Sequence, residues 1–274
     1  MRNKKLLKNI ITYIFVFCSA FVVLVPLYMV FSTAFKPTLE IKKIPPSIFF
    51  KPTFTHLKDI ISDGFLGYFG NTFIIAGINT VLSVVFGFLA AYGLLLAKGK
   101  WATRLSDLIL CGKLLPTIAI AIPYYIILSN NGWTGTYVGP ILAHTAMNLP
   151  FVMWLFLGFL RELPKELMDA ALIDGCGRIA CMWTIYVPLL RPSIGSAVLL
   201  ATQYSWNELL FNTVLTDLKT YPLTVGVARY AGGVSIYWGK CCMAVLLTLL
   251  PIVILGFLMQ KYMVRGLTAG AIKG

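Results

Sequence analysis

The sequence predicts an all-α membrane protein with six transmembrane helices. Hydrophobic residues make up 58% of the 274-residue chain and charged residues only 12%, and the mean hydropathy is +0.83. A soluble domain of this length would carry about 25% charged residues. Six apolar segments approach or exceed the roughly 20 residues that a helix needs to cross a bilayer. The net charge of +13 comes mainly from basic residues between these segments. There they set topology, so a nucleic-acid partner is not expected.

Each expected span has its own justification in the sequence. The first follows a short basic start and is too long, with no small-residue cleavage site, for a signal peptide. The second is long enough to tilt. Prolines lie inside the third, fourth and sixth, where neighbouring helices can satisfy the freed carbonyls, so we expect kinks there. The spans cover about 10–33, 68–96, 106–128, 137–159, 193–214 and 241–262 of a single transmembrane domain, 1–274.

The distribution of basic residues predicts the orientation of the chain. Six spans put both termini on one side of the membrane. That side holds fourteen lysines and arginines, and the opposite side holds eight, with Lys113 inside a span left out. Because basic residues concentrate on the cytoplasmic side, both termini and the long loop 160–192 are expected in the cytoplasm. Cys176 and Cys181 in this loop would then stay reduced, and no cysteine spacing suggests a metal site.

The loop 160–192 predicts a short helix–turn–helix outside the membrane, between spans four and five. Pro164 suits a first helical turn, and Glu166 places negative charge near the positive end of the helix. Gly175 is a typical helix terminator. The small side chains of Ala170 and Ala171 let another surface approach closely. From the residues alone, the loop is either a hairpin packed on its own bundle or a docking element.

The loop also resembles the cytoplasmic signature of permease subunits of bacterial ABC importers. That signature is Glu-Ala-Ala, three residues, Gly, nine residues, Ile, one residue, Leu-Pro. Here it reads Asp169-Ala170-Ala171, Gly175, Ile185 and Val187-Pro188, with matching spacing. Asp replaces Glu and Val replaces Leu.

Further stretches resemble the second permease subunit of maltose-type importers, and together they cover almost the whole chain. They are Pro26-Leu-Tyr28, Phe35-Lys-Pro37, Asn71-Thr72, Ala90-Ala-Tyr92, Trp206-Asn-Glu208 and the tail 266–274.

The resemblance implies a fold, partners and roles. Two permeases, here expected to differ, would form the path for a sugar or oligosaccharide that an external binding protein delivers. Two ATPase subunits would dock beneath them and would carry the ATP and magnesium. The chain itself would be a multi-pass protein of the bacterial plasma (inner) membrane and would bind no cofactor. The residues that the resemblance assigns to ATPase coupling are Asp169, Ala170, Ala171 and Gly175, with Glu166, Asp174 and Arg178 as polar contacts on the rim.

The chain is not expected to be an enzyme. A phosphate loop needs G-x-x-x-x-G-K-[ST] after a strand. The nearest approximation, Gly233 to Cys241, has a spacer one residue too long and ends in cysteine.

The sequence gives weaker candidates for a sugar path. Sugars bind through aromatic faces and a few polar groups, and a glutamate inside a span usually faces a cavity or a partner. The candidates are Trp206, Asn207, Glu208, Tyr124, Tyr125, His144 and Asn148. A structural polar cluster, with aromatic anchors at span ends, is the alternative interpretation.

Two other classes of function fit less well. A transporter driven by an ion gradient would need coupling acids in its spans, and only Glu208 and Asp107 qualify. A membrane-embedded enzyme would need a nucleophile–base pair or metal ligands, and the chain has only His56 and His144.

Overall fold

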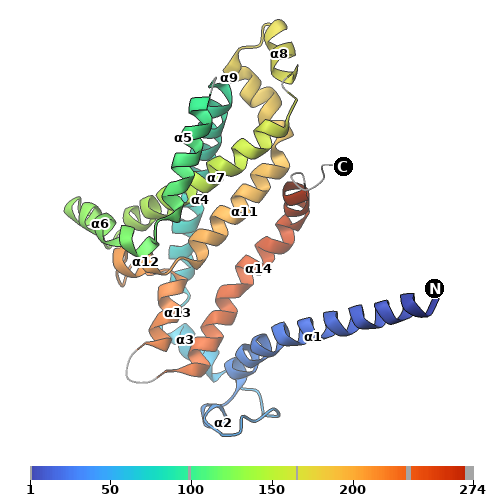
Figure 1. Cartoon of the computed structure of the whole chain (residues 1–274). Helices are drawn as coiled ribbons and strands as arrows, with labels where there is room; N and C mark the ends of the chain where they lie inside the picture. The colour runs from blue at the N-terminus through green and yellow to red at the C-terminus, as the bar shows by residue number, and fades with distance from the viewer. Residues whose placement is uncertain (1, 98–99, 165, 233–235, 269–274) are drawn as a thin grey trace. The chain divides into compact units, whose positions relative to one another are not determined.

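The computed structural model describes residues 2–97, 100–164, 166–232 and 236–268, with side chains for 9–97, 100–164, 166–232 and 236–260. Within these ranges the regular structure is helical (Figure 1), which confirms the predicted all-α class. Residues 269–274 of the family-like tail and residues 233–235 of the phosphate-loop approximation lie outside the described residues.

Sixteen helical segments occur along the described chain. In order they are α1 (Arg2–Phe35), α2 (Thr38–Ile41), α3 (Thr55–Ser62), α4 (Gly67–Leu96), α5 (Lys100–Cys111), the 3-10 turn η1 (Gly112–Leu114), α6 (Thr117–Asn130), α7 (Val138–Glu162), α8 (Glu166–Ile173), α9 (Arg178–Cys181), the π-helical turn η2 (Met182–Tyr186), α10 (Val187–Leu189), α11 (Arg191–Asn207), α12 (Leu210–Leu215), α13 (Leu223–Ala231) and α14 (Trp238–Thr268).

Four of these helices are long and apolar enough to cross a membrane by themselves. They comprise Asn9–Phe35, Gly67–Leu96, Val138–Glu162 and Trp238–Gln260, and the number in the described chain rises to six if each of two bent helix pairs is one span. One bent pair joins Lys100–Leu114 to Thr117–Asn130 at 93°, and the other joins Arg178–Leu189 to Arg191–Asn207 at 78°.

The expected third and fifth spans are therefore not single straight helices. At the break after η1, Leu115 is extended because it precedes Pro116, and Pro116 has no N–H to continue the helix. The expected fifth span, 193–214, is interrupted where α11 ends at Asn207 and Glu208 adopts an extended backbone before α12.

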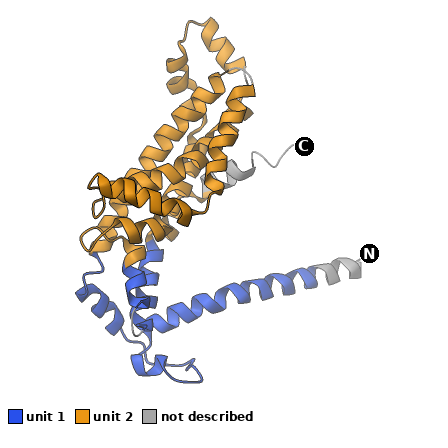
Figure 2. Ribbon diagram, turned by 60° about the vertical axis from the view of Figure 1, so that its left-hand side comes forward, with its two compact units in different colours: residues 1–66, 226–250 blue, residues 67–225, 251–274 orange. Residues whose placement is uncertain are grey.

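The chain divides into two compact units, which Figure 2 colours separately. Unit 1 comprises residues 1–66 and 226–250, and unit 2 comprises residues 67–225 and 251–274. In unit 1, the buried ring of His56 contacts the carbonyl of Lys36 through Nε2, at 2.9 Å. A Cβ on Gly239 would lie 2.2 Å from the same nitrogen, so only glycine lets α14 approach α3 this closely.

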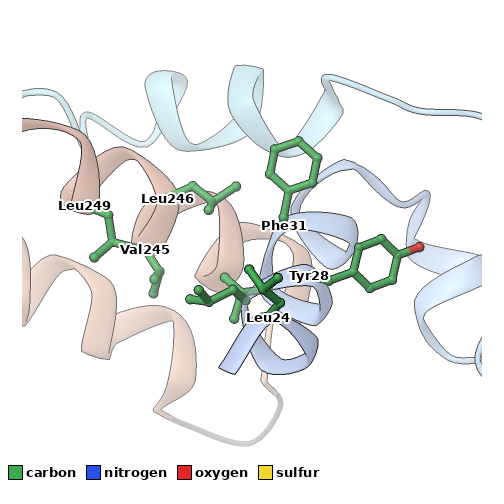
Figure 3. A pocket seen from close by; sticks show the side chains of 8 residues that line it. Leu24, Tyr28, Phe31, Val245, Leu246 and Leu249 are labelled. Atoms are coloured by element: carbon green, nitrogen blue, oxygen red, sulfur yellow. The ribbon is translucent and has the colours of Figure 1, made fainter. Parts of the chain in front are cut away.

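An apolar hollow of about 450 Å³ lies between α1 and α14 within unit 1 (Figure 3). Its lining residues include Leu24, Tyr28 and Phe31 of α1 and Val245 and Leu246 of α14, all labelled in Figure 3. Most of the large apolar side chains of α1 are exposed in the isolated chain. This surface suits lipid or another apolar protein surface better than water.

The core of unit 2 forms where α4, α7 and α11 pack together. Within the described residues α4 and α7 make the most extensive helix–helix contact, and Gly87 lies in it. A Cβ on Gly87 would lie 2.8 Å from Val152 Cγ1 and 3.2 Å from the Met153 backbone nitrogen. Small residues permit such close helix approach in membranes. The core continues into the loop after α7 through buried Met182 and Tyr186.

Candidate functional site

The loop between α7 and α11 contains the predicted helix–turn–helix. Its first helix, α8, has Glu166 and Asp169 in its first turn, where acidic groups interact favourably with the helix dipole. The helix ends at Ile173, and the chain turns at Gly175, which has a φ of +81°. The Cys176 N–H donates to the Ala171 carbonyl at 2.9 Å, and the Gly175 N–H donates to the Leu172 carbonyl at 3.1 Å. This left-handed cap requires the glycine.

The side chains of α8 divide into an exposed face and a buried face. Most of the expected coupling residues are exposed, namely Glu166, Asp169, Ala170, Asp174, Gly175 and Arg178. Ile173 is 85% exposed. Ala171 differs because only 8% of it is exposed, so its side chain packs inward within this chain. The exposed face of α8 thus combines acidic groups, a small residue and a large apolar residue.

A hollow of about 440 Å³ lies behind α8, between it and the adjoining ends of α4 and α7. Leu95 and Leu96 of α4 contribute to its wall, as do Leu160 and Arg161 of α7. The lining residues after the end of α7 are Leu163, Met168, Asp169, Leu172, Arg178 and Tyr186. Behind α8 the bundle is therefore incompletely filled.

The second half of the loop is packed far more tightly. Cys181, Met182, Tyr186 and Leu190 are all buried, and the last three belong to the core shared with α4, α7 and α11. The loop therefore joins an exposed helix, α8, to a segment that embeds one face in the bundle and leaves Ile179 and Trp183 exposed.

A buried polar cluster connects α7 to the end of α11. His144 is fully buried, and its Nδ1 lies 2.6 Å from Ser205 Oγ. Its Nε2 lies 3.3 Å from Glu208 Oε2, which is an ion pair when the imidazole is protonated. The Glu208 carboxylate also accepts hydrogen bonds from the backbone N–H groups of Phe211 and Asn212, at 3.0 and 3.1 Å. Glu208 therefore caps the first turn of α12, as carboxylates do at helix N-termini.

Two further expected path residues also point into the bundle. Asn148 is buried and donates to the Ala201 carbonyl at 3.1 Å. Trp206 is 3% exposed, and its ring meets that of Phe73 edge-on at 5.2 Å between centroids. The polar groups of Asn148 and Glu208 are thus occupied within the chain, whereas His144 Nε2 is buried with no hydrogen-bond partner among the described residues.

The remaining path candidates lie nearer the surface. Asn207 is exposed and donates to the Gln203 carbonyl, Tyr125 is 45% exposed, and Tyr124 is half-buried against the ring of Phe211.

A shallow hollow of about 410 Å³ lies on α11. Its lining residues are Leu200, Gln203, Tyr204, Asn207 and Glu208. Gln203 and Tyr204 were missed by sequence reasoning. Their three- and four-residue spacing from Leu200 and Asn207 was the signal that could have found them.

Lys113 is another polar group that contributes to this region. Its Nζ donates to the Met147 carbonyl at 3.1 Å and lies 4.7 Å from the centre of the Tyr204 ring. In the described residues, no three His, Cys, Asp or Glu side chains gather where they could hold a metal ion.

Comparisons with known proteins agree with this architecture. The chain is 33% identical over 234 residues to the trehalose/maltose transport system permease protein MalG of Thermococcus litoralis, covering 84% of each chain. It is 34% identical over 208 residues to the melibiose/raffinose/stachyose import permease protein MelC of Bacillus subtilis, covering 75% of each.

A solved structure of a bacterial ABC transporter that imports the acidic polysaccharide alginate shares the fold. One of its chains superposes with a TM-score of 0.77 at 18% identity, over 93% of this chain and 95% of that one. Residues 83–269 match the family of binding-protein-dependent transport system inner membrane components. This match spans more than half of the sequence, so the chain belongs to that family of membrane transport components.

Proposed function

We propose that this chain is one of two permease subunits of an ATP-driven importer for a carbohydrate that an external binding protein delivers. The observation that carries the proposal is the likeness, over most of both chains, to permeases named for trehalose, maltose, melibiose, raffinose and stachyose. The polar and aromatic lining of the hollow on α11 is compatible with a sugar, whose ring faces stack on aromatic groups.

In this proposal α8 is the coupling helix that docks on an ATPase subunit in the cytoplasm. The exposure of Asp169, Ala170 and Ile173 supports this role, because these side chains are free to contact a partner. Ala171, by contrast, is buried within its own chain. ATP binding by the ATPases would then move α8, and the membrane helices would reorient between two discrete arrangements. Both chain termini would also lie in the cytoplasm, as the distribution of basic residues predicts.

We assign the exposed candidates, rather than the buried cluster, to direct sugar contact. Asn207, Tyr124 and Tyr125 have the exposure that a path residue needs, and Gln203 and Tyr204 join them from the same region. His144, Asn148 and Trp206 would support these side chains from inside the bundle. Glu208, which also lines the hollow, would fix the break between α11 and α12. A fixed break would hold the exposed side chains in one arrangement.

The remaining partners follow from the same proposal. A second, different permease would complete the path, and two ATPase subunits would supply hydrolysis, so this chain would carry no ATPase site and no cofactor of its own. The exposed apolar surface of α1 supports contact with lipid or with the second permease.

Uptake by the reconstituted complex tests the proposal. The chain would be co-purified with a candidate second permease, ATPase and binding protein from the same organism and placed in proteoliposomes. We expect uptake of a labelled di- or oligosaccharide that requires ATP and the binding protein. Uptake by this chain without the ATPase, driven by an imposed ion gradient, would contradict the proposal and favour a secondary transporter.

A further inference from the structure

We infer that Tyr92, near the end of α4, is the positioning residue through which the loop transmits its movement to the membrane helices. The inference rests on the proposed docking of α8 and assigns a role to the Ala-Ala-Tyr stretch that the proposed function leaves unexplained. Its basis is one hydrogen bond, from the Tyr92 hydroxyl to the Arg178 backbone carbonyl, at 2.7 Å. These residues are 86 positions apart in the chain.

The hydrogen bond joins a membrane helix to the first turn of the embedded half of the loop. Arg178 begins α9, and its carbonyl also accepts the helical hydrogen bond from the Met182 N–H. The Tyr92 hydroxyl uses the second lone pair of that oxygen. Displacement of α9 would therefore pull directly on α4.

Aromatic contacts hold the Tyr92 ring in place for this bond. Its ring meets that of Tyr186 edge-on at 5.5 Å between centroids, and it stacks with Phe88 at 6.4 Å. Phe88 in turn meets Phe156 of α7 edge-on at 5.4 Å. All four rings are buried, with at most 6% of each residue exposed. The Tyr92 hydroxyl, which donates this hydrogen bond, is thus held by packed rings from both α4 and α7.

The surroundings of α8 contrast with this rigid support. The hollow of about 440 Å³ behind α8 leaves it room to shift, and Tyr186 is part of the hollow's wall. The segment that carries Tyr186 is a π-helical turn, a feature that is frequent at functional sites. Tyr92 therefore lies at the boundary between a helix with room to move and the packed bundle.

Replacing Tyr92 by phenylalanine removes the hydrogen bond to the Arg178 carbonyl while the fold is kept. The Tyr92→Phe variant keeps the ring contacts, and the Arg178 carbonyl keeps its bond to Met182, so no buried carbonyl loses its last partner. Tyr186→Phe is the matched control. Tyr186 is similarly buried in the same ring pair, and within the described part of the chain its hydroxyl makes no hydrogen bond.

The experiment measures ATP hydrolysis and sugar uptake by the same proteoliposomes, at equal amounts of assembled complex. For Tyr92→Phe we expect the ATP hydrolysed per sugar transported to rise about fivefold, in line with the loss of one hydrogen bond. The melting temperature should fall by no more than about 2–4 °C, and the amount of bound ATPase should match that of the unaltered complex. Tyr186→Phe should keep the original ratio.

Three results would overturn the inference. These are an unchanged ratio in Tyr92→Phe, the same change in Tyr186→Phe, and a loss of uptake in Tyr92→Phe explained by less folded or assembled complex. Failure of the proposed function is distinguishable, because the unaltered complex itself would then show no sugar uptake dependent on ATP and binding protein.

Discussion

The two halves of the loop between α7 and α11 are neighbours in sequence, yet they differ in what surrounds them. α8 exposes Ala170 and Ile173 and has a hollow behind it. The segment α9–η2–α10 buries Met182 and Tyr186 in the core of unit 2. A coupling element needs both properties, a surface for the partner and a firm attachment to the helices that must move. Here the firm attachment belongs to the second half, whereas exposed surface occurs on α8 and also at Ile179 and Trp183 of the second half.

Truncation of a buried side chain in the embedded half should have the largest effect on stability. Met182→Ala would remove contacts with the core and is expected to lower the free energy of unfolding by about 2–5 kcal/mol. Thermal denaturation of the purified protein in detergent measures the change. An unaltered melting temperature would mean that this half is not part of the core.

Truncation on the exposed half should instead affect docking. Ile173→Ala should change stability by no more than about 0.5 kcal/mol, because the side chain is 85% exposed. Loss of the apolar contact with the ATPase, worth about 1.5–3 kcal/mol if fully buried there, would weaken binding at least tenfold. Titration of the ATPase against the permease pair in nanodiscs measures this. Undiminished affinity would remove Ile173 from the docking surface.

Removal of the carboxylate at the break between α11 and α12 tests the buried cluster. Glu208→Ala would leave the Phe211 and Asn212 N–H groups without their acceptor, at a cost of about 1–3 kcal/mol. Thermal denaturation again measures the loss, and Glu162→Ala, an exposed carboxylate at the end of α7, serves as the control. Equal stability of the two variants would contradict the capping role of Glu208.

The smallest effect is expected at the turn that joins the two halves. Gly175→Ala would force a side chain into a backbone with φ of +81°, at about 1–2 kcal/mol. Gly177→Ala is the matched control, because Gly177 has φ of −70° and open space around it. We expect faster amide exchange at Cys176 in Gly175→Ala only. Equal exchange in both variants would show that the left-handed turn does not set the end of α8.

Sequence reasoning predicted the helical class and the exposed loop helix well, because long apolar runs and the spacing from Glu166 to Gly175 are local signals. It missed how sharply the expected third span bends and the break at Glu208 inside the expected fifth span. Pro116 predicted a kink, but the sequence did not predict its angle of 93°, because that angle depends on how α6 packs on α12. It also could not tell that Trp206 is buried and Asn207 is exposed. Neighbouring residues of a helix point in different directions, and which direction is buried depends on how the helix packs.

The most direct test of the account is a cysteine cross-link from the exposed face of α8 to the ATPase. Ala170→Cys suits this better than Ala171→Cys, because Ala170 is exposed and Ala171 is buried. Both would be built in a background without the six native cysteines and paired with a cysteine in the docking groove of the ATPase. The account predicts a cross-link at position 170 whose yield changes with ATP, and a much weaker one at 171. Absence of any cross-link at 170 in an assembled, transporting complex would contradict the assignment of α8 as the coupling helix.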